Sequence, residues 1–113
     1  LTAIRYIRSL LAREEQVSCI FFYQDATLVA NQLNQPPSDE VQVLAEWEKL
    51  TNDSQIELLT CVAASYRRGV IDANESNDLS VAEHNLSESF TIAGLGQFSS
   101  ALLKDNAKLV HFK

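Results

Sequence analysis

The apolar residues at the start of the chain recur with helical spacing. Five of them share one helical face: Ala3, Ile4, Ile7, Leu10 and Leu11. This stripe predicts an amphipathic helix over the first eleven residues. Neither a methionine nor a clear N-cap residue precedes the stripe. We therefore expect the natural protein to begin upstream, with a strand before this helix that is missing from the chain.

Further along the chain, short runs are almost entirely apolar and are typical of buried strands. They cover residues 17–23, 56–64, 90–93 and 109–112. Helical patterns lie between them, at about residues 26–30, 40–51, 65–68 and 98–103. Because strands alternate with helices, the pattern predicts an α/β layered fold with a mostly parallel sheet. We expect four strands in this chain and five in the parent sheet.

Polar residues mark where several helices should begin. Asp25 is placed to cap the helix at 26–30. Three further pairs have the spacing of a capping box: Asp39 with Gln42, Asp72 with Glu75, and Ser80 with Glu83. The last two pairs predict short helices on the surface.

Size and charge limit the possible classes of protein. With 113 residues, of which 46% are hydrophobic, the chain is expected to form one soluble domain over residues 1–113, incomplete at its N-terminus. The net charge is −6 and the basic residues are scattered apart from Arg67-Arg68, which argues against direct nucleic-acid binding. Cys19 and Cys61 show no close pairing, and no signal peptide or membrane span is visible. We expect a cytoplasmic protein.

Cys61 is the main candidate for chemistry because it lies near a predicted strand-to-helix junction. In open α/β sheets such junctions form the functional edge. The start of the following helix, and the guanidinium of Arg67 or Arg68, would favour the thiolate of Cys61. The alternative is that Cys61 is a small buried apolar residue, and the arginines a solvated helix end.

Cys19 lies inside an apolar run, where burial disfavours a thiolate, so we expect a structural role for it. The chain has no Cys-x-x-Cys motif and hence no local resolving thiol. A single-thiol mechanism remains, in which Cys61 accepts a sulfane sulfur as a persulfide and passes it to another thiol.

Other possible sites carry weaker signals. Gly94-Leu95-Gly96 lacks the third glycine of a dinucleotide-binding motif, and we expect a tight packing turn there. His84 and His111 have no companions at metal-ligand spacing. We expect His84 on the surface and His111 in the last strand, and neither a metal nor a cofactor.

Blocks of sequence along nearly the whole chain resemble the DsrE-like family, in the same order and at compatible spacing. They are Phe21-Phe22-Tyr23, residues 30–33 and 37–40, Cys61-Val62-Ala63-Ala64, residues 67–70, and residues 90–96. The resemblance is to the family's branch in the bacterial sulfur relay that makes tRNA 2-thiouridine. It implies a DsrE-like α/β fold and a sulfurtransferase subunit.

The resemblance also implies a site and partners. Cys61 matches the family's persulfide-bearing cysteine, which relays sulfur for 2-thiolation of the tRNA wobble uridine. The implied assembly is a dimer of heterotrimers with TusB-like and TusC-like subunits, a TusA-like donor and a TusE-like acceptor, without direct contact to nucleic acid or membrane. Cys19 matches no catalytic position of the family.

The family's first strand and the glycine-containing loop after it have no counterpart in this sequence. That loop would lie at the same sheet edge as Cys61. Three alternative functions remain open: a DsrE-type subunit of dissimilatory sulfur oxidation, an interaction subunit with an inert thiol, and a nucleotide-binding flavodoxin-like module.

Overall fold

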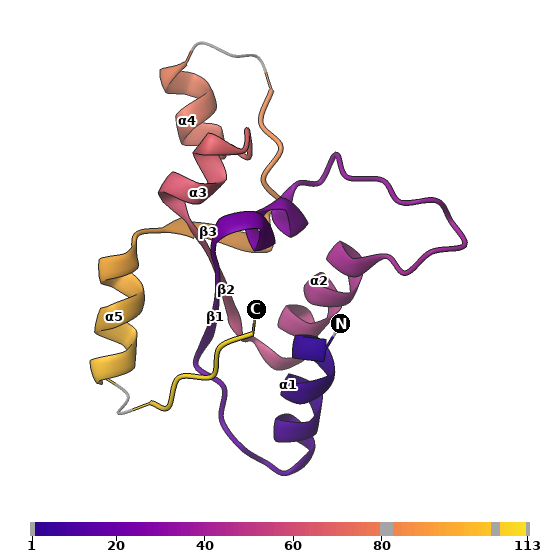
Figure 1. The fold of residues 1–113 in the computed structure, drawn as a ribbon, viewed down its shortest axis with the longest axis vertical. Helices are drawn as coiled ribbons and strands as arrows, with labels where there is room; N and C mark the ends of the chain where they lie inside the picture. The colour runs from indigo at the N-terminus through magenta and orange to yellow at the C-terminus, as the bar shows by residue number, and fades with distance from the viewer. Residues whose placement is uncertain (1, 80–82, 105–106, 113) are drawn as a thin grey trace.

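The three strands found in the described part of the chain form one parallel sheet in the order β1-β2-β3 (Figure 1). The computed structural model describes residues 2–79, 83–104 and 107–112. The strands are β1 (Cys19–Phe22), β2 (Glu57–Cys61) and β3 (Phe90–Ala93). All pairs run parallel, which confirms the predicted α/β fold with a parallel sheet.

Helices lie on both faces of this sheet and at its carboxyl edge. They are α1 (Thr2–Ala12), the 3-10 helix η1 (Gln24–Ala30), α2 (Val43–Ser54), α3 (Val62–Arg67), α4 (Ala73–Asp78) and α5 (Leu95–Lys104). In Figure 1, α5 lies on the opposite side of the sheet from α1 and α2, while α3 and α4 extend beyond the strand ends. The predicted N-terminal helix is thereby confirmed as α1.

The main core lies between the sheet and the pair α1 and α2. Alternate residues of a strand face opposite sides, and on this side the strands contribute Phe22, Leu58 and Phe90. The ring of Phe22 packs edge-on against Trp47 of α2, with ring centroids 5.0 Å apart. Ile4 is buried in the same cluster, so the apolar stripe of α1 faces the core as predicted.

The other face of the sheet is covered more thinly. Phe21 stacks on Phe98 of α5 with ring centroids 4.7 Å apart. Leu58, Leu59 and Thr60 of the central strand are buried, whereas only Phe22 is buried in β1. The apolar run of β1 predicted a strand covered on both faces, and this is confirmed, since Phe21 packs against α5 and Phe22 against α2, although only Phe22 is fully buried.

The predicted strand at residues 109–112 is wrong. Residues 107–112 have irregular structure, and Leu109 and Val110 are exposed. The ring of Phe112 packs against Tyr6 of α1 with centroids 5.6 Å apart. A strand needs a neighbouring strand for its backbone hydrogen bonds, and none of the described strands pairs with this segment. The described residues therefore contain three strands, one fewer than expected.

The predicted turn at Gly94-Leu95-Gly96 is also wrong, because α5 begins at Leu95. The side chain of Gln97 accepts a hydrogen bond from the backbone N–H of Gly94 at 2.9 Å. The backbone N–H of Gln97 in turn donates to the Gly94 carbonyl at 3.1 Å. These reciprocal bonds start the helix three residues before the apolar pattern suggested.

Two of the predicted helix caps are wrong. Asp25 lies inside η1, whose N-cap residue is Tyr23. The capping box predicted for Asp39 and Gln42 does not form, and α2 begins at Val43 instead of residue 40. The Gln42 side chain donates to the carbonyl oxygens of Pro37 and Glu40. Ser80, the predicted cap of the third pair, lies outside the described residues, while its partner Glu83 is exposed in irregular structure.

The predicted cap at Asp72 is confirmed, since its carboxylate accepts a hydrogen bond from the backbone N–H of Glu75 at 2.9 Å. We expect Asp72→Ala to lower the free energy of unfolding by about 1 kcal/mol, because the first turn of α4 loses this acceptor. Urea unfolding measures the change. Asn74→Ala, at an exposed position of the same helix, is the control, and equal losses in both variants would contradict the capping role.

The ion pair between α1 and α2 makes a pH-dependent contribution to stability. Arg8 Nη2 lies 2.7 Å from Glu46 Oε2. The hydrogen bond and charge of Arg8 lower the pKa of Glu46. A lowered folded-state pKa gives stability that is present above the unfolded pKa, about 4.3, and is lost as the pH falls through the folded value.

We therefore expect Arg8→Ala to be less stable than the unchanged chain at pH 7 by a small amount, since the pair is half-exposed. The difference should vanish when both are unfolded in urea near pH 3. A difference that persists at low pH would show that Arg8 acts through packing instead.

Candidate functional site

Cys61 ends the central strand of the sheet and begins α3. It is the last residue of β2 and the N-cap of α3, with extended backbone angles φ −60° and ψ 125°. Its side chain is half-buried. The strand-to-helix junction predicted for Cys61 is confirmed, and the residue is not fully buried.

The neighbours of Cys61 come from both flanking strands. Ala93, at the end of β3, pairs with Cys61. On the other side, Phe22 pairs with Thr60, so the extended residue Tyr23 follows beside Cys61. The Tyr23 hydroxyl contacts His111 Nε2 of the C-terminal segment. The carboxyl ends of all three strands thus meet at one edge, with Cys61 in the middle.

A buried hydroxyl pair closes the turn that carries Cys61. Thr60 Oγ1 and Ser65 Oγ lie 2.7 Å apart, and both residues are 0% exposed. One residue precedes Cys61 in β2, and the other lies in α3. This hydrogen bond therefore joins the strand to the helix across the thiol-bearing turn.

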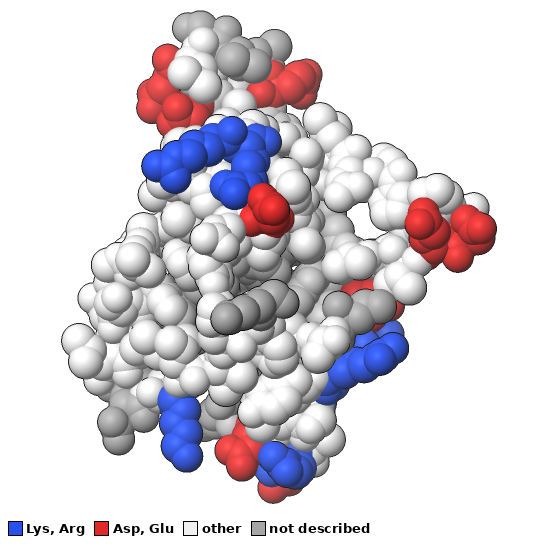
Figure 2. Space-filling model, viewed as in Figure 1, with Lys and Arg blue, Asp and Glu red and all other residues white. Residues whose placement is uncertain are grey.

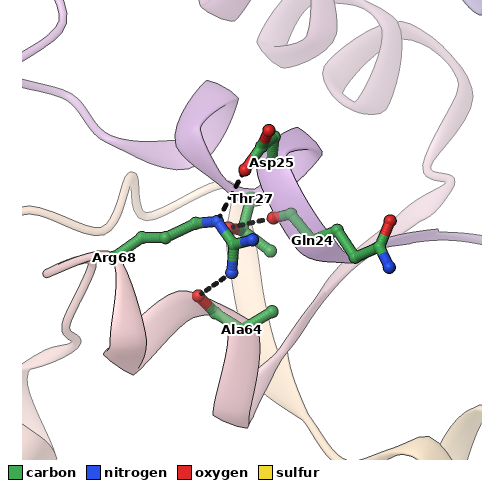
Figure 3. A network of polar contacts seen from close by, with 5 residues as sticks. All are labelled: Gln24, Asp25, Thr27, Ala64 and Arg68. Atoms are coloured by element: carbon green, nitrogen blue, oxygen red, sulfur yellow. Dashed lines mark hydrogen bonds and ion pairs between the residues drawn. The ribbon is translucent and has the colours of Figure 1, made fainter.

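Arg68 connects α3 to η1. Its Nε donates to the carboxylate of Asp25 at 2.9 Å, and its Nη1 donates to the Ala64 carbonyl at 3.1 Å (Figure 3). Within η1, the Thr27 hydroxyl donates to the Gln24 carbonyl at 2.8 Å. The network holds the segment after β1 against the helix after β2.

The two arginines predicted beside the thiol lie at the far end of α3. Arg67 is its last residue and is exposed, and Arg68 is its C-cap residue. Arg67 is six positions after Cys61, which is about 9 Å along a helix axis. The charge of Arg68 is already paired with Asp25. Stabilisation of a Cys61 thiolate by either arginine stays a prediction.

Tyr66 ties the same helix to α4. Its hydroxyl donates to the carboxylate of Asp72 at 3.5 Å. Burial, followed by the negative charges of Asp72 and Glu75, raises the pKa of Tyr66. The phenol therefore remains a protonated donor at neutral pH.

The second cysteine lies at the opposite end of the sheet. Cys19 is the first residue of β1 and pairs with Glu57, the first residue of β2. No disulfide joins it to Cys61. Its side chain is half-buried, more exposed than the structural interpretation predicted. The two thiols are thus separated by the length of the strands.

The histidines show no metal-binding arrangement. His84 is exposed, as predicted, and His111 is exposed in the irregular C-terminal segment instead of a strand. Among the residues that the structure describes, no three His, Cys, Asp or Glu side chains lie close enough to hold a metal ion. Nor does any described helix have the length and apolar character to cross a membrane.

The basic side chains are scattered over the surface, as they are along the sequence. Figure 2 shows basic side chains in small separate groups on the face in view, with no continuous basic stripe there. Acidic side chains lie beside several of these groups. That face of the described residues therefore lacks the basic track that binds a nucleic-acid backbone.

Sequence reasoning placed Cys61 at the strand-to-helix junction but missed the residues that hold the turn there. Thr60 and Ser65 had no signal beyond being small and hydroxyl-bearing. Asp25 was interpreted as a helix cap, although its carboxylate pairs with Arg68. These partners are 5 and 43 residues apart in sequence, and only the packing of α3 brings them together.

Comparison with known proteins identifies a family. A sequence model described as the DsrE/DsrF-like family matches residues 1–112. The chain is 39% identical over 102 residues to a protein named Sulfurtransferase TusD from Klebsiella pneumoniae (strain 342), covering 90% of this chain and 80% of the relative. It is 41% identical over 102 residues to a Sulfurtransferase TusD homolog from Aliivibrio fischeri, covering 90% and 78%.

These matches span nearly the whole chain, and the parallel α/β sheet is consistent with the fold expected from the resemblance. The chain belongs to the DsrE/DsrF-like family.

Proposed function

We propose that this chain is a sulfurtransferase subunit that carries sulfane sulfur as a persulfide on Cys61. The observation that supports it most is the position of Cys61, half-buried at the carboxyl end of the central strand. The relatives named Sulfurtransferase TusD support the reaction class. In this proposal the sulfur is relayed between proteins for 2-thiolation of the tRNA wobble uridine.

The transfer needs one nucleophilic thiol and no redox cofactor. The Cys61 thiolate attacks the outer sulfur of a donor persulfide, R–S–SH. The new S–S bond forms as the donor S–S bond breaks, which gives Cys61-S-SH and the donor thiolate R–S⁻. An acceptor thiolate then repeats the same exchange on the Cys61 persulfide. Sulfur is moved without net oxidation or reduction.

The surroundings of Cys61 suit this exchange. A thiolate is the reactive form of cysteine, and Cys61 is the N-cap residue of α3, at the positive end of the helix dipole. Arg67 and Arg68 are proposed to add long-range positive charge only, since Arg68 is paired with Asp25. A single thiol is sufficient because the partner proteins supply the other sulfur atoms.

The proposed partners follow from the same relay. They are TusB-like and TusC-like subunits in a dimer of heterotrimers, a TusA-like donor and a TusE-like acceptor, all in the cytoplasm. A subunit that receives sulfur from one protein and delivers it to another does not need to bind the tRNA itself. The net charge of −6 supports this division of roles.

The test is to incubate the protein with a cysteine desulfurase, cysteine and a TusA-like carrier, and to map persulfides by peptide mass spectrometry. We expect the mass of one additional sulfur atom on the peptide that contains Cys61. Loading on the Cys19 peptide alone, or on neither peptide, would refute the proposal. Omitting the desulfurase is the control for adventitious sulfur.

A further inference from the structure

The hydroxyl groups of Thr60 and Ser65 lie on the buried side of the turn that carries Cys61. The two oxygens lie 2.7 Å apart with both residues fully buried. Among the described residues, each of these hydroxyl groups forms its hydrogen bond with the other, and not with the sulfur of Cys61. The pair therefore does not take part in sulfur chemistry directly. It connects the two elements that meet at Cys61.

The helix that follows Cys61 depends on contacts with the rest of the protein for its position. A helix of six residues is too short to be stable without tertiary contacts. The side chain of Cys61, its N-cap residue, makes no capping hydrogen bond. At the far end, α3 is held to η1 by the Arg68 and Asp25 pair, which is partly exposed. In the middle of α3, the buried bond between Ser65 and Thr60 holds the helix to the end of β2.

We propose that Thr60 and Ser65 are positioning residues for Cys61. Their hydrogen bond holds the β2–α3 turn so that the sulfur stays at the carboxyl edge of the sheet, where a docked protein persulfide can reach it. This inference rests on the proposed function. In-line attack between two proteins needs accurate placement, because a displacement of about 1 Å can slow a reaction by about 100-fold.

The buried position makes the bond effective for this purpose. Water cannot replace a partner that is lost at a fully buried site, so loss of one hydroxyl leaves the other unpaired. Replacement of both hydroxyls by apolar groups of similar shape is much less destabilising. A double variant at Thr60 and Ser65 can therefore remove the hydrogen bond between β2 and α3 while the protein stays folded.

The experiment uses the full chain with Cys19→Ser, so that Cys61 is the only thiol. Thr60→Val, Ser65→Ala and the double variant remove the bond, while Thr60→Ser retains a hydroxyl. A persulfidated carrier protein supplies sulfur, and mass spectrometry follows the loading rate. We expect the first three variants to load about 10-fold to 100-fold more slowly, and Thr60→Ser to restore most of the rate.

Amide hydrogen exchange of residues 68–70 provides a second readout that does not depend on sulfur transfer, because their backbone N–H groups donate to the carbonyls of Ser65 and Tyr66 in α3. We expect faster exchange in Thr60→Val and in the double variant. Ile7→Val in α1 is the control for general destabilisation, because Ile7 is buried in the core among α1 and α2. It should leave both the loading rate and the exchange of residues 68–70 unchanged.

The outcomes separate this inference from the proposed function. Wild-type loading and exchange in the double variant would overturn the positioning role, as would equal slowing in Ile7→Val. If the chain with both hydroxyls accepts no sulfur, the proposed function fails. Hydrogen exchange then still decides whether the pair holds the turn, and unchanged exchange in the double variant would overturn the inference.

Discussion

Cys61→Ser is expected to abolish sulfur loading. A serine hydroxyl is a weak nucleophile without an adjacent base, and it cannot form the S–S bond of a persulfide. Mass spectrometry after incubation with desulfurase and carrier should show no added sulfur anywhere in the variant. The substitution exchanges one atom at a half-buried position, so the circular dichroism spectrum should not change.

Cys19→Ser is the matched control, because it makes the same substitution at the opposite end of the parallel strands. We expect it to load sulfur at the rate of the unchanged chain. Equal loading in the two single variants would show that the assignment of the site to Cys61 is wrong. Loss in both would indicate that the two thiols act together despite their separation.

Leu58→Ala is expected to lower the free energy of unfolding by about 2–5 kcal/mol. Leu58 is 1% exposed in the central strand and belongs to the core cluster with Phe22 and Phe90. Truncation removes buried apolar surface and leaves a cavity that neighbouring side chains on a regular sheet can fill only in part. Because domains of this size are stable by about 5–15 kcal/mol, the loss is a large part of the total.

Leu103→Ala makes the same change on α5, where the side chain is 85% exposed. We expect its effect to be within about 0.5 kcal/mol, since little apolar surface leaves water there. Urea unfolding followed by circular dichroism compares the two variants. A similar loss at both positions would show that Leu103 is covered in solution, for example by self-association.

Patterns that repeat over many residues predicted structure well. The stripe at 3.6-residue spacing became α1. Within the long apolar run at residues 56–64, residues 57–61 became the central strand, whereas residues 62–64 form the start of α3. A run of this kind indicates burial on two faces, and the middle of the sheet is where that occurs. The position of Cys61 followed from the same pattern, since the strand ends there.

Short local signals were less reliable. The apolar run at residues 109–112 did not form a strand, and Gly94 to Gly96 did not form a turn. Asp72 caps its helix as predicted, whereas Asp25 forms an ion pair with Arg68 instead of a helix cap. In each case one or two side chains decide the outcome, and their partners are chosen by packing that a single local window does not contain.

The sequence by itself determined the parallel α/β class, the main helical and strand segments, and the junction at which Cys61 lies. These features depend on periodic burial and on residues adjacent in the chain. Only the tertiary structure decided that the thiol is half-buried, that Arg68 pairs with Asp25, and that Thr60 and Ser65 close the turn. Such contacts depend on side-chain directions and on how neighbouring elements pack, which spacing along one chain does not specify.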